Sequence, residues 1–222
     1  MKLDQLIILL AFLSSAMFYG QPSAVSCNCP QNDYLKTKTD TIFYLSNGKM
    51  IALCGYKNLD TKPVTYSEFV LAECGKDKII SFWGALLECR LKVDKENLLI
   101  THLVNLPVGI NFEYQDTEWK TQKLNFGRER IDSTLIVNRG IRKYTQDEIK
   151  SVLKSYKIKA AKRELNEDVM VIVNELFVAI LSGNKTARKY FRSFPTEFGL
   201  LDGGWSEEYD DLVGMLLEWD SR

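Results

Sequence analysis

Residues 41–56 read TIFYLSNGKMIALCGY, which is two runs rich in β-branched and aromatic residues with Ser46, Asn47 and Gly48 between them. An Asn-Gly pair between apolar runs is typical of a tight turn, because both residues tolerate the positive φ angles that such a turn needs. The stretch therefore predicts a β-hairpin with strands at 41–45 and 49–56.

Similar runs continue to about residue 138, interrupted by turn residues and by prolines. Short strands spaced in this way are typical of an antiparallel sheet folded as a sandwich or as a partly open barrel. We expect roughly seven strands among these runs, the later ones shorter and more polar: 41–45, 49–56, 66–74, 78–93, 98–106, 109–114, 119–126 and 133–137.

The sequence changes character at residue 144. Thr145 and Glu148 have the spacing of a capping box, and Tyr144 and Ile149 stand at the positions of a hydrophobic staple. Apolar residues then recur at helical spacing as far as Ala160. We predict an α+β fold in which a β-rich region at 27–143 precedes a unit of about four helices at 144–222 that packs on it.

Three helices are expected after the first one. Asn166 is a candidate cap for the second, whose residues 169–181 are apolar nearly all round, which indicates a helix covered on most sides. The β-branched residues at 169–173 leave a strand there as an alternative.

Asn184 is expected to cap the third helix, and Pro195 is expected to end it. Ser206 is expected to cap the fourth helix, which places Glu207 and Glu208 in its first turn, where carboxylates meet the positive end of the helix dipole.

The N-terminal residues 1–26 indicate export. Lys2 precedes an apolar run of roughly 14 residues, which suits a signal peptide and falls short of the ~20 residues that span a bilayer. Residues 24–27, Ala-Val-Ser-Cys, resemble a bacterial lipobox, which implies lipidation of Cys27. Simple cleavage followed by a flexible leader is the alternative that we favour, so we expect a periplasmic, secreted or lipid-anchored protein.

The five cysteines predict disulfides, because exported thiols meet an oxidising environment. If Cys27 is lipidated, four cysteines remain, and otherwise one thiol is left over. The disulfide candidates are Cys29, Cys54, Cys74 and Cys89. A single histidine and a one-residue Cys27–Cys29 spacing give little support for a zinc site, so no metal is expected.

The charges balance, with 29 Lys+Arg against 29 Asp+Glu. This balance argues against nucleic-acid binding, which needs a basic excess. Residues 27–144 hold 17 basic and 14 acidic residues and residues 145–222 hold 11 and 14, so the two parts carry about +3 and −3, which favours their docking. The sequence has no Walker or Gly-x-Gly-x-x-Gly spacing, so we expect no nucleotide or other cofactor.

His102 is the natural general base to consider, because it is the only histidine and its ordinary pKa lies near neutrality. No Gly-x-Ser-x-Gly elbow supplies a serine, and pairing with Cys54, Cys74 or Cys89 requires a thiol that escapes oxidation. We therefore interpret His102 as a structural or surface residue.

Two acidic clusters lie beside aromatic residues. Glu113, Asp116 and Glu118 raise the question of paired carboxylates for glycoside hydrolysis, although such pairs are common by chance. The second cluster is the binding candidate, a platform for a cation or a sugar, although a solvated helix start explains it more simply. Its residues are Trp205, Glu207, Glu208, Tyr209 and Asp211.

The densest basic stretch suits an anionic partner or lipid headgroups, although a solvated loop explains it more simply. It consists of Arg128, Arg130, Arg139, Arg142 and Lys143.

These observations favour a non-catalytic binding or structural module of a cell envelope. Its partner is expected to be a protein or small ligand of the envelope, with membrane contact only through a lipid on Cys27. One alternative is a small hydrolase that uses His102 or a carboxylate pair. The other is an inhibitor or immunity-type protein whose acidic C-terminal helix faces a basic partner.

Overall fold

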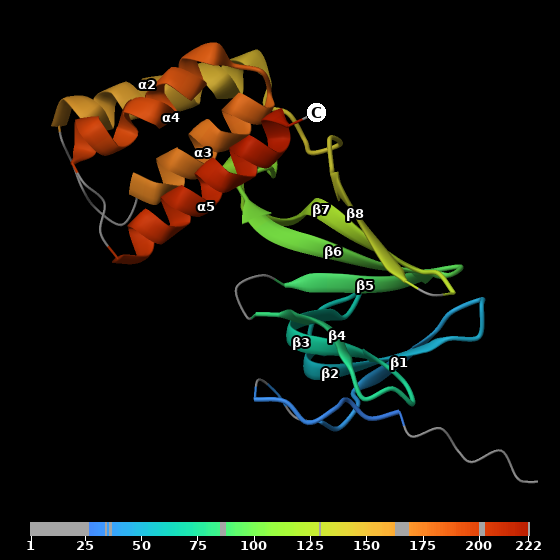
Figure 1. The fold of residues 1–222 in the computed structure, drawn as a ribbon. Helices are drawn as coiled ribbons and strands as arrows, with labels where there is room; N and C mark the ends of the chain where they lie inside the picture. The colour runs from blue at the N-terminus through green and yellow to red at the C-terminus, as the bar shows by residue number, and fades with distance from the viewer. Residues whose placement is uncertain are drawn as a thin grey trace, which may run out of the picture.

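The computed structural model describes residues 27–33, 35, 37–84, 88–128, 130–162, 169–199 and 203–221, so the expected signal segment at 1–26 lies outside the described residues. Within them, eight strands form one antiparallel sheet that stays open, and four helices follow in sequence (Figure 1). The predicted α+β class is confirmed. The strands are β1 (Thr41–Tyr44), β2 (Met50–Asn58), β3 (Thr65–Glu73), β4 (Ile79–Trp83), β5 (Cys89–Asp94), β6 (Asn97–Leu106), β7 (Gln115–Phe126) and β8 (Ile131–Val137).

The hairpin predicted at 41–56 is confirmed, with β1 and β2 paired antiparallel. The N–H of Leu45 donates to the carbonyl of Lys49 at 2.9 Å, which closes the turn. Gly48 has a φ of 82° there, a value that glycine adopts without the steric cost a side chain would bring.

The predicted strand at 78–93 is wrong as a single element. One edge of β3 carries β4 along residues 69–72 and β5 at Tyr66, so the chain changes partners between the two strands. The sheet then runs in the order β1-β2-β3-β5-β6-β7-β8.

The run at 109–114 is not a strand either, because Asn111 and Phe112 have φ angles of 55° and 63° that end the extended backbone. A short 3-10 helix, η1 (Ile110–Phe112), lies there instead.

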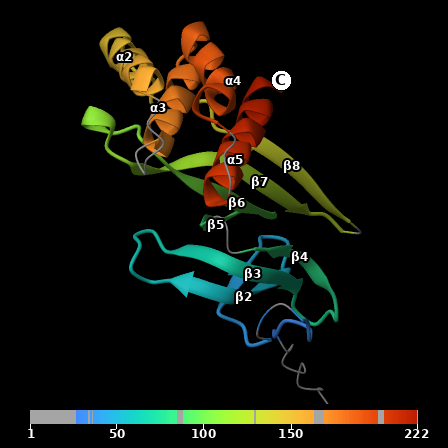
Figure 2. The same ribbon diagram turned by 90° about the vertical axis from the view of Figure 1, so that its left-hand side faces the viewer.

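The sheet folds over itself, so that β1–β4 lie against β5–β7 (Figure 2). Alternate residues of each strand point to the same face, and those faces meet in an apolar core. The core is made by Leu45, Ile51, Leu53, Tyr66, Phe69, Leu71, Cys89, Leu98, Ile100, Leu124 and Phe126.

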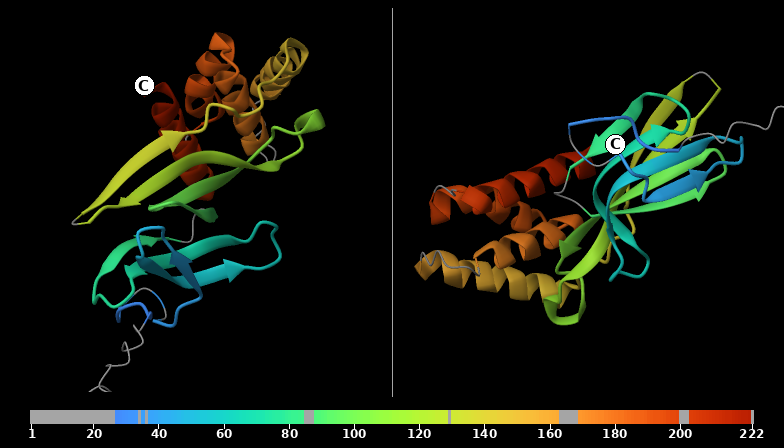
Figure 3. Two further views of the ribbon diagram at one scale, coloured as in Figure 1. Left: turned by 90° about the vertical axis from the view of Figure 1, so that its right-hand side faces the viewer. Right: turned by 90° about the horizontal axis from the view of Figure 1, so that it is seen from below.

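Four helices occupy the opposite side of β5–β8 from β1–β4 (Figures 1 and 3). They are α2 (Gln146–Lys162), α3 (Val169–Leu181), α4 (Lys185–Phe198) and α5 (Gly203–Asp220). The predicted capping box is present at the start of α2, where the N–H of Thr145 donates to Glu148 at 2.7 Å and the N–H of Glu148 donates to the Thr145 hydroxyl at 3.3 Å. None of the described helices is long and apolar enough to cross a bilayer.

Residues 169–181 form a helix, so the strand alternative for 169–173 is wrong. α3 is buried on most sides, as its apolar composition predicts, and it packs against α2, α4 and α5. The proposed cap Asn166 lies outside the described residues.

The predicted cap of α4 is confirmed, since the Asn184 side chain accepts a hydrogen bond from the N–H of Ala187 at 2.8 Å. The predicted end at Pro195 is wrong, because α4 continues to Phe198. A proline inside a helix normally leaves the carbonyl four residues earlier without its donor. Here the Tyr209 hydroxyl donates to that carbonyl, the one of Phe191, at 2.9 Å.

The fourth helix begins earlier than predicted. α5 starts at Gly203, so Ser206 lies inside the helix rather than at its cap, and Glu207 and Glu208 are not in the first turn. Trp205 and Tyr209 are one turn apart and pack on the helical core, which explains why the helix extends over the glycines before them.

Candidate functional site

A groove lies between α5 and the strands β6 and β7. It consists of two recesses of about 300 and 260 Å³ that share Val104, Asp211 and Met215, and we call it the α5 groove. Small-molecule and peptide sites are recesses of this kind, with apolar walls and a few placed polar groups.

The floor of the α5 groove is apolar. Val104 and Leu106 contribute from β6, and Leu212 and Met215 contribute from α5. Leu106 and Leu212 belong to the core that joins the helices to the sheet, so the floor is fixed in position by that packing.

The rim of the α5 groove is acidic, with Lys120 as the single cation among the described lining residues. The Lys120 ammonium is already paired with Glu218. The carboxylates come from α5, from β7 and from the residue before β5, and they are Glu88, Asp116, Glu208, Asp210, Asp211 and Glu218.

Four of these carboxylates are held by hydrogen bonds, and Glu218 is one of them, since it accepts from the indole N–H of Trp119 at 2.8 Å. Glu208 accepts from the buried Asn174 amide at 2.6 Å, and Asp116 accepts from Asn105 at 3.0 Å. Glu88 accepts from Thr65 at 2.9 Å. Such bonds fix the carboxylates in place, so an incoming cation would meet charges that are already oriented.

The structure separates the five predicted binding residues. Glu208 and Asp211 line the α5 groove. Trp205 and Tyr209 pack against the helical core instead, and Glu207 is exposed. Helical spacing accounts for this division, because Trp205 and Tyr209 are four residues apart and share the side of α5 that packs on the core.

His102 lies directly opposite Cys89 in the β5–β6 register, so the structure brings one predicted Cys–His pair together. Burial raises the pKa of the Cys89 thiol to about 12, and Glu88 adds to the effect. Burial also lowers the pKa of His102, with Lys120 acting in the same direction. A protonated thiol beside a neutral imidazole is a poor nucleophile.

The structure contains two disulfides, Cys27–Cys74 and Cys29–Cys54. Cys89 is buried and belongs to neither, so its selection as a disulfide candidate is not supported. The Cys27 sulfur cannot hold both a disulfide and a lipid thioether. With these two pairs formed, Cys89 is the one cysteine left over.

We expect the Cys89 thiol to resist alkylation in the folded protein. Iodoacetamide at about pH 8, near the ordinary pKa of a thiol, should add nothing to the native chain, one group in denaturant, and five groups after reduction. Intact mass measures the additions. Rapid labelling of the native protein would contradict the burial of Cys89. Only four alkylated thiols after reduction, together with the mass of an acyl group, would show that Cys27 is lipidated.

The other clusters considered from the sequence are dispersed. In the first acidic cluster, Asp116 bonds Asn105 and Glu118 pairs with Arg90 at 3.4 Å. Among the described residues, no three His, Cys, Asp or Glu side chains are grouped so that they could hold a metal ion.

The basic stretch is also divided. Arg139 donates to the carbonyls of Trp219 and Ser221 at the end of α5, and Arg142 pairs with Glu148 at 2.6 Å. These two arginines attach a loop to the helices.

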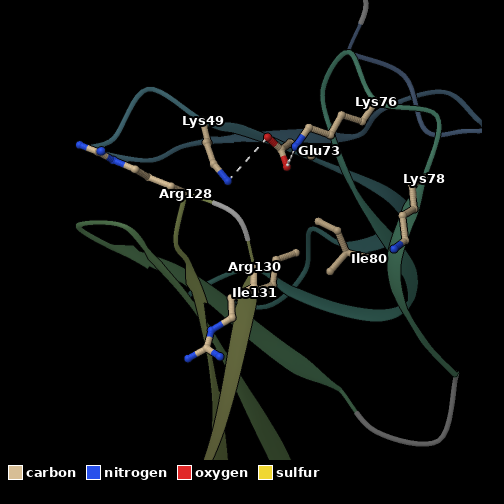
Figure 4. A pocket seen from close by; sticks show the side chains of 8 residues that line it. All are labelled: Lys49, Glu73, Lys76, Lys78, Ile80, Arg128, Arg130 and Ile131. Carbon is tan, nitrogen blue, oxygen red and sulfur yellow. Dashed lines mark hydrogen bonds and ion pairs between the residues drawn. The ribbon is translucent and has the colours of Figure 1, made fainter.

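Arg128 and Arg130 lie elsewhere and line a recess of about 400 Å³ with lysines far from them in sequence (Figure 4). The sequence offers no signal for those lysines, which are Lys49, Lys76 and Lys78.

Comparison of this chain with protein-family models, with curated proteins and with solved structures finds no match.

Proposed function

We propose that this chain is an exported, non-catalytic binding module of the cell envelope that holds a cationic, partly apolar segment of a partner protein in the α5 groove. The observation that carries the proposal is the combination of an apolar floor with an acidic rim. Lysine or arginine side chains of a partner would reach the rim while its apolar side chains cover the floor.

Export is supported by two features. The apolar segment before Cys27 has the length of a signal peptide, and disulfides such as Cys29–Cys54 persist mainly in oxidising compartments. The disulfide at Cys27 favours simple cleavage over lipidation.

A role as an inhibitor or immunity-type protein would use the same surface, since its target would also present basic residues. The poor nucleophilicity of Cys89 beside His102 makes the hydrolase alternative less attractive.

The proposal is tested with a labelled amphipathic peptide that alternates lysine and leucine. Removing two rim charges with Asp116→Asn and Asp211→Asn should weaken binding and flatten its salt dependence. Exposed ion pairs contribute about 0.2–1 kcal/mol each, so each substitution should raise the dissociation constant by up to about five-fold. Fluorescence anisotropy measures the effect.

Asp147→Asn is the control for each single rim substitution, because it removes one charge from an exposed carboxylate on α2 away from the groove. If the double variant binds the peptide as tightly as the wild type does, the α5 groove is not the binding surface. Equal weakening by the control would show that only net charge matters.

A further inference from the structure

A second recess lies where three turns of the chain meet, and we call it the basic recess (Figure 4). Lys49 comes from the turn between β1 and β2, and Lys76 and Lys78 come from the turn between β3 and β4. Arg128 and Arg130 come from the turn between β7 and β8.

The lining of the basic recess carries more positive charge than the protein neutralises. Its five cations face one lining carboxylate, Glu73, whose oxygens lie 2.7 Å from the Lys76 ammonium and 3.9 Å from that of Lys49. Arg130 pairs with Asp132 at 3.0 Å. Lys78 and Arg128 form no ion pair with any described residue.

The turns around the basic recess are held together by hydrogen bonds. The Asn47 side chain donates to the carbonyl of Phe126 at 2.8 Å, and the Lys49 ammonium donates to that of Gly127 at 2.7 Å. On the other wall, Glu73 is followed by Cys74, which is bonded to Cys27. The two hydrogen bonds hold the β1–β2 turn against the β7–β8 turn, so Lys49 stays near Arg128 and Arg130 despite their mutual repulsion.

The cations line the hollow from different sides, with the lysines around it and the two arginine guanidinium groups directed outward at its edge. In Figure 4 the Lys49 and Lys76 ammonium groups converge on Glu73, Lys78 stands on the far wall, and the Arg128 guanidinium extends outward. Ile80 and Ile131 supply an apolar wall between them.

We infer that the basic recess binds a compact, multiply charged phosphate anion such as a diphosphate group. Arginine forks bond phosphate oxygens in pairs and lysine acts as a point charge, so a mixed set suits such a ligand. Cations on separate walls favour more than one anionic group, and a volume of about 400 Å³ accommodates a small ligand. The group would belong to a soluble molecule or to a lipid headgroup.

The inference is tested by titrating the protein without residues 1–26, with both disulfides formed, with inorganic pyrophosphate in a calorimeter. The wild type should bind, and added salt should weaken the binding. The double variant Lys78→Gln, Arg128→Gln should lose about ten-fold or more in affinity, because it removes the two cations that no described carboxylate neutralises.

Two further variants make the test specific. Lys154→Gln with Lys157→Gln removes the same charge from the exposed face of α2 and should leave pyrophosphate affinity unchanged. Glu73→Gln should raise the affinity several-fold, since it removes the one carboxylate that competes for Lys49 and Lys76. Circular dichroism verifies that each variant is folded.

A parallel assay uses phosphatidylcholine vesicles with and without phosphatidylglycerol to distinguish the two sources. Binding of pyrophosphate but not of vesicles indicates a soluble ligand, and vesicle binding that depends on Lys78 and Arg128 indicates a lipid headgroup. The inference is overturned if neither probe binds, or if the α2 control weakens binding as much as the recess variant does. The rim variants Asp116→Asn and Asp211→Asn should leave pyrophosphate binding intact, so this inference and the proposed function fail independently.

Discussion

Replacing Trp119 by alanine is expected to destabilise the protein by about 3–5 kcal/mol, the range for removing a large buried aromatic side chain. Trp119 is 1% exposed, and its ring lies 5.8 Å from that of Phe177 and 5.9 Å from that of Trp219. Its indole N–H donates to Glu218 at 2.8 Å. The side chain therefore connects β7 to α3 and α5, and alanine would leave a cavity at that junction.

Urea unfolding followed by circular dichroism measures the loss. Leu217→Ala is the matched control on α5, because Leu217 is 67% exposed and its removal should change stability little. Trp119→Phe should fall between the two, since it retains an aromatic ring and loses the bond to Glu218. An unchanged unfolding midpoint for Trp119→Ala would mean that the helices do not depend on this contact with the sheet.

The local features of the fold could be predicted from the sequence. The hairpin around Asn47 and Gly48 and the capping box at Thr145 and Glu148 each depend on a few neighbouring residues. Their hydrogen bonds are present in the structure because short-range geometry decides them.

Features that depend on distant partners could not be predicted. Pro195 normally ends a helix, and only the Tyr209 hydroxyl, which lies on another helix, supplies the missing donor. The division of residues 78–93 into two strands also depends on distant pairing, since β4 and β5 meet different parts of β3.

The candidate sites show the same dependence. Glu208 and Asp211 belong to one short cluster and could be proposed from the sequence, whereas Glu88 and Asp116 join them only through the sheet. In the basic recess, Lys49 lies in the first hairpin, and the other four cations of the recess are far from it in sequence. Sheet folding brings these charges together, and no local pattern records that.

Gly55 is the position where one added methyl group should have the largest effect. A Cβ atom built on Gly55 would lie 2.2 Å from the Glu68 carbonyl oxygen and 2.6 Å from the Phe69 Cα atom. Both are backbone atoms of the paired strand β3, so no side-chain rotation relieves the contact. The β2–β3 register shifts between Gly55 and Lys57, so the close approach belongs to a bulge in the ladder.

We therefore expect Gly55→Ala to destabilise the protein by about 3 kcal/mol or more, at or beyond the upper end of ordinary overpacking. Gly214→Ala is a control with the opposite sign, because Gly214 lies inside α5 with nothing within 4 Å of an added Cβ. Alanine there should stabilise the helix by about 0.5–1 kcal/mol. Urea midpoints of the two variants should move in opposite directions. If Gly55→Ala has the same urea midpoint as the wild type, β2 and β3 do not approach as closely as the structure shows. The strand β3, which leads into the turn with Lys76 and Lys78, would then be placed differently.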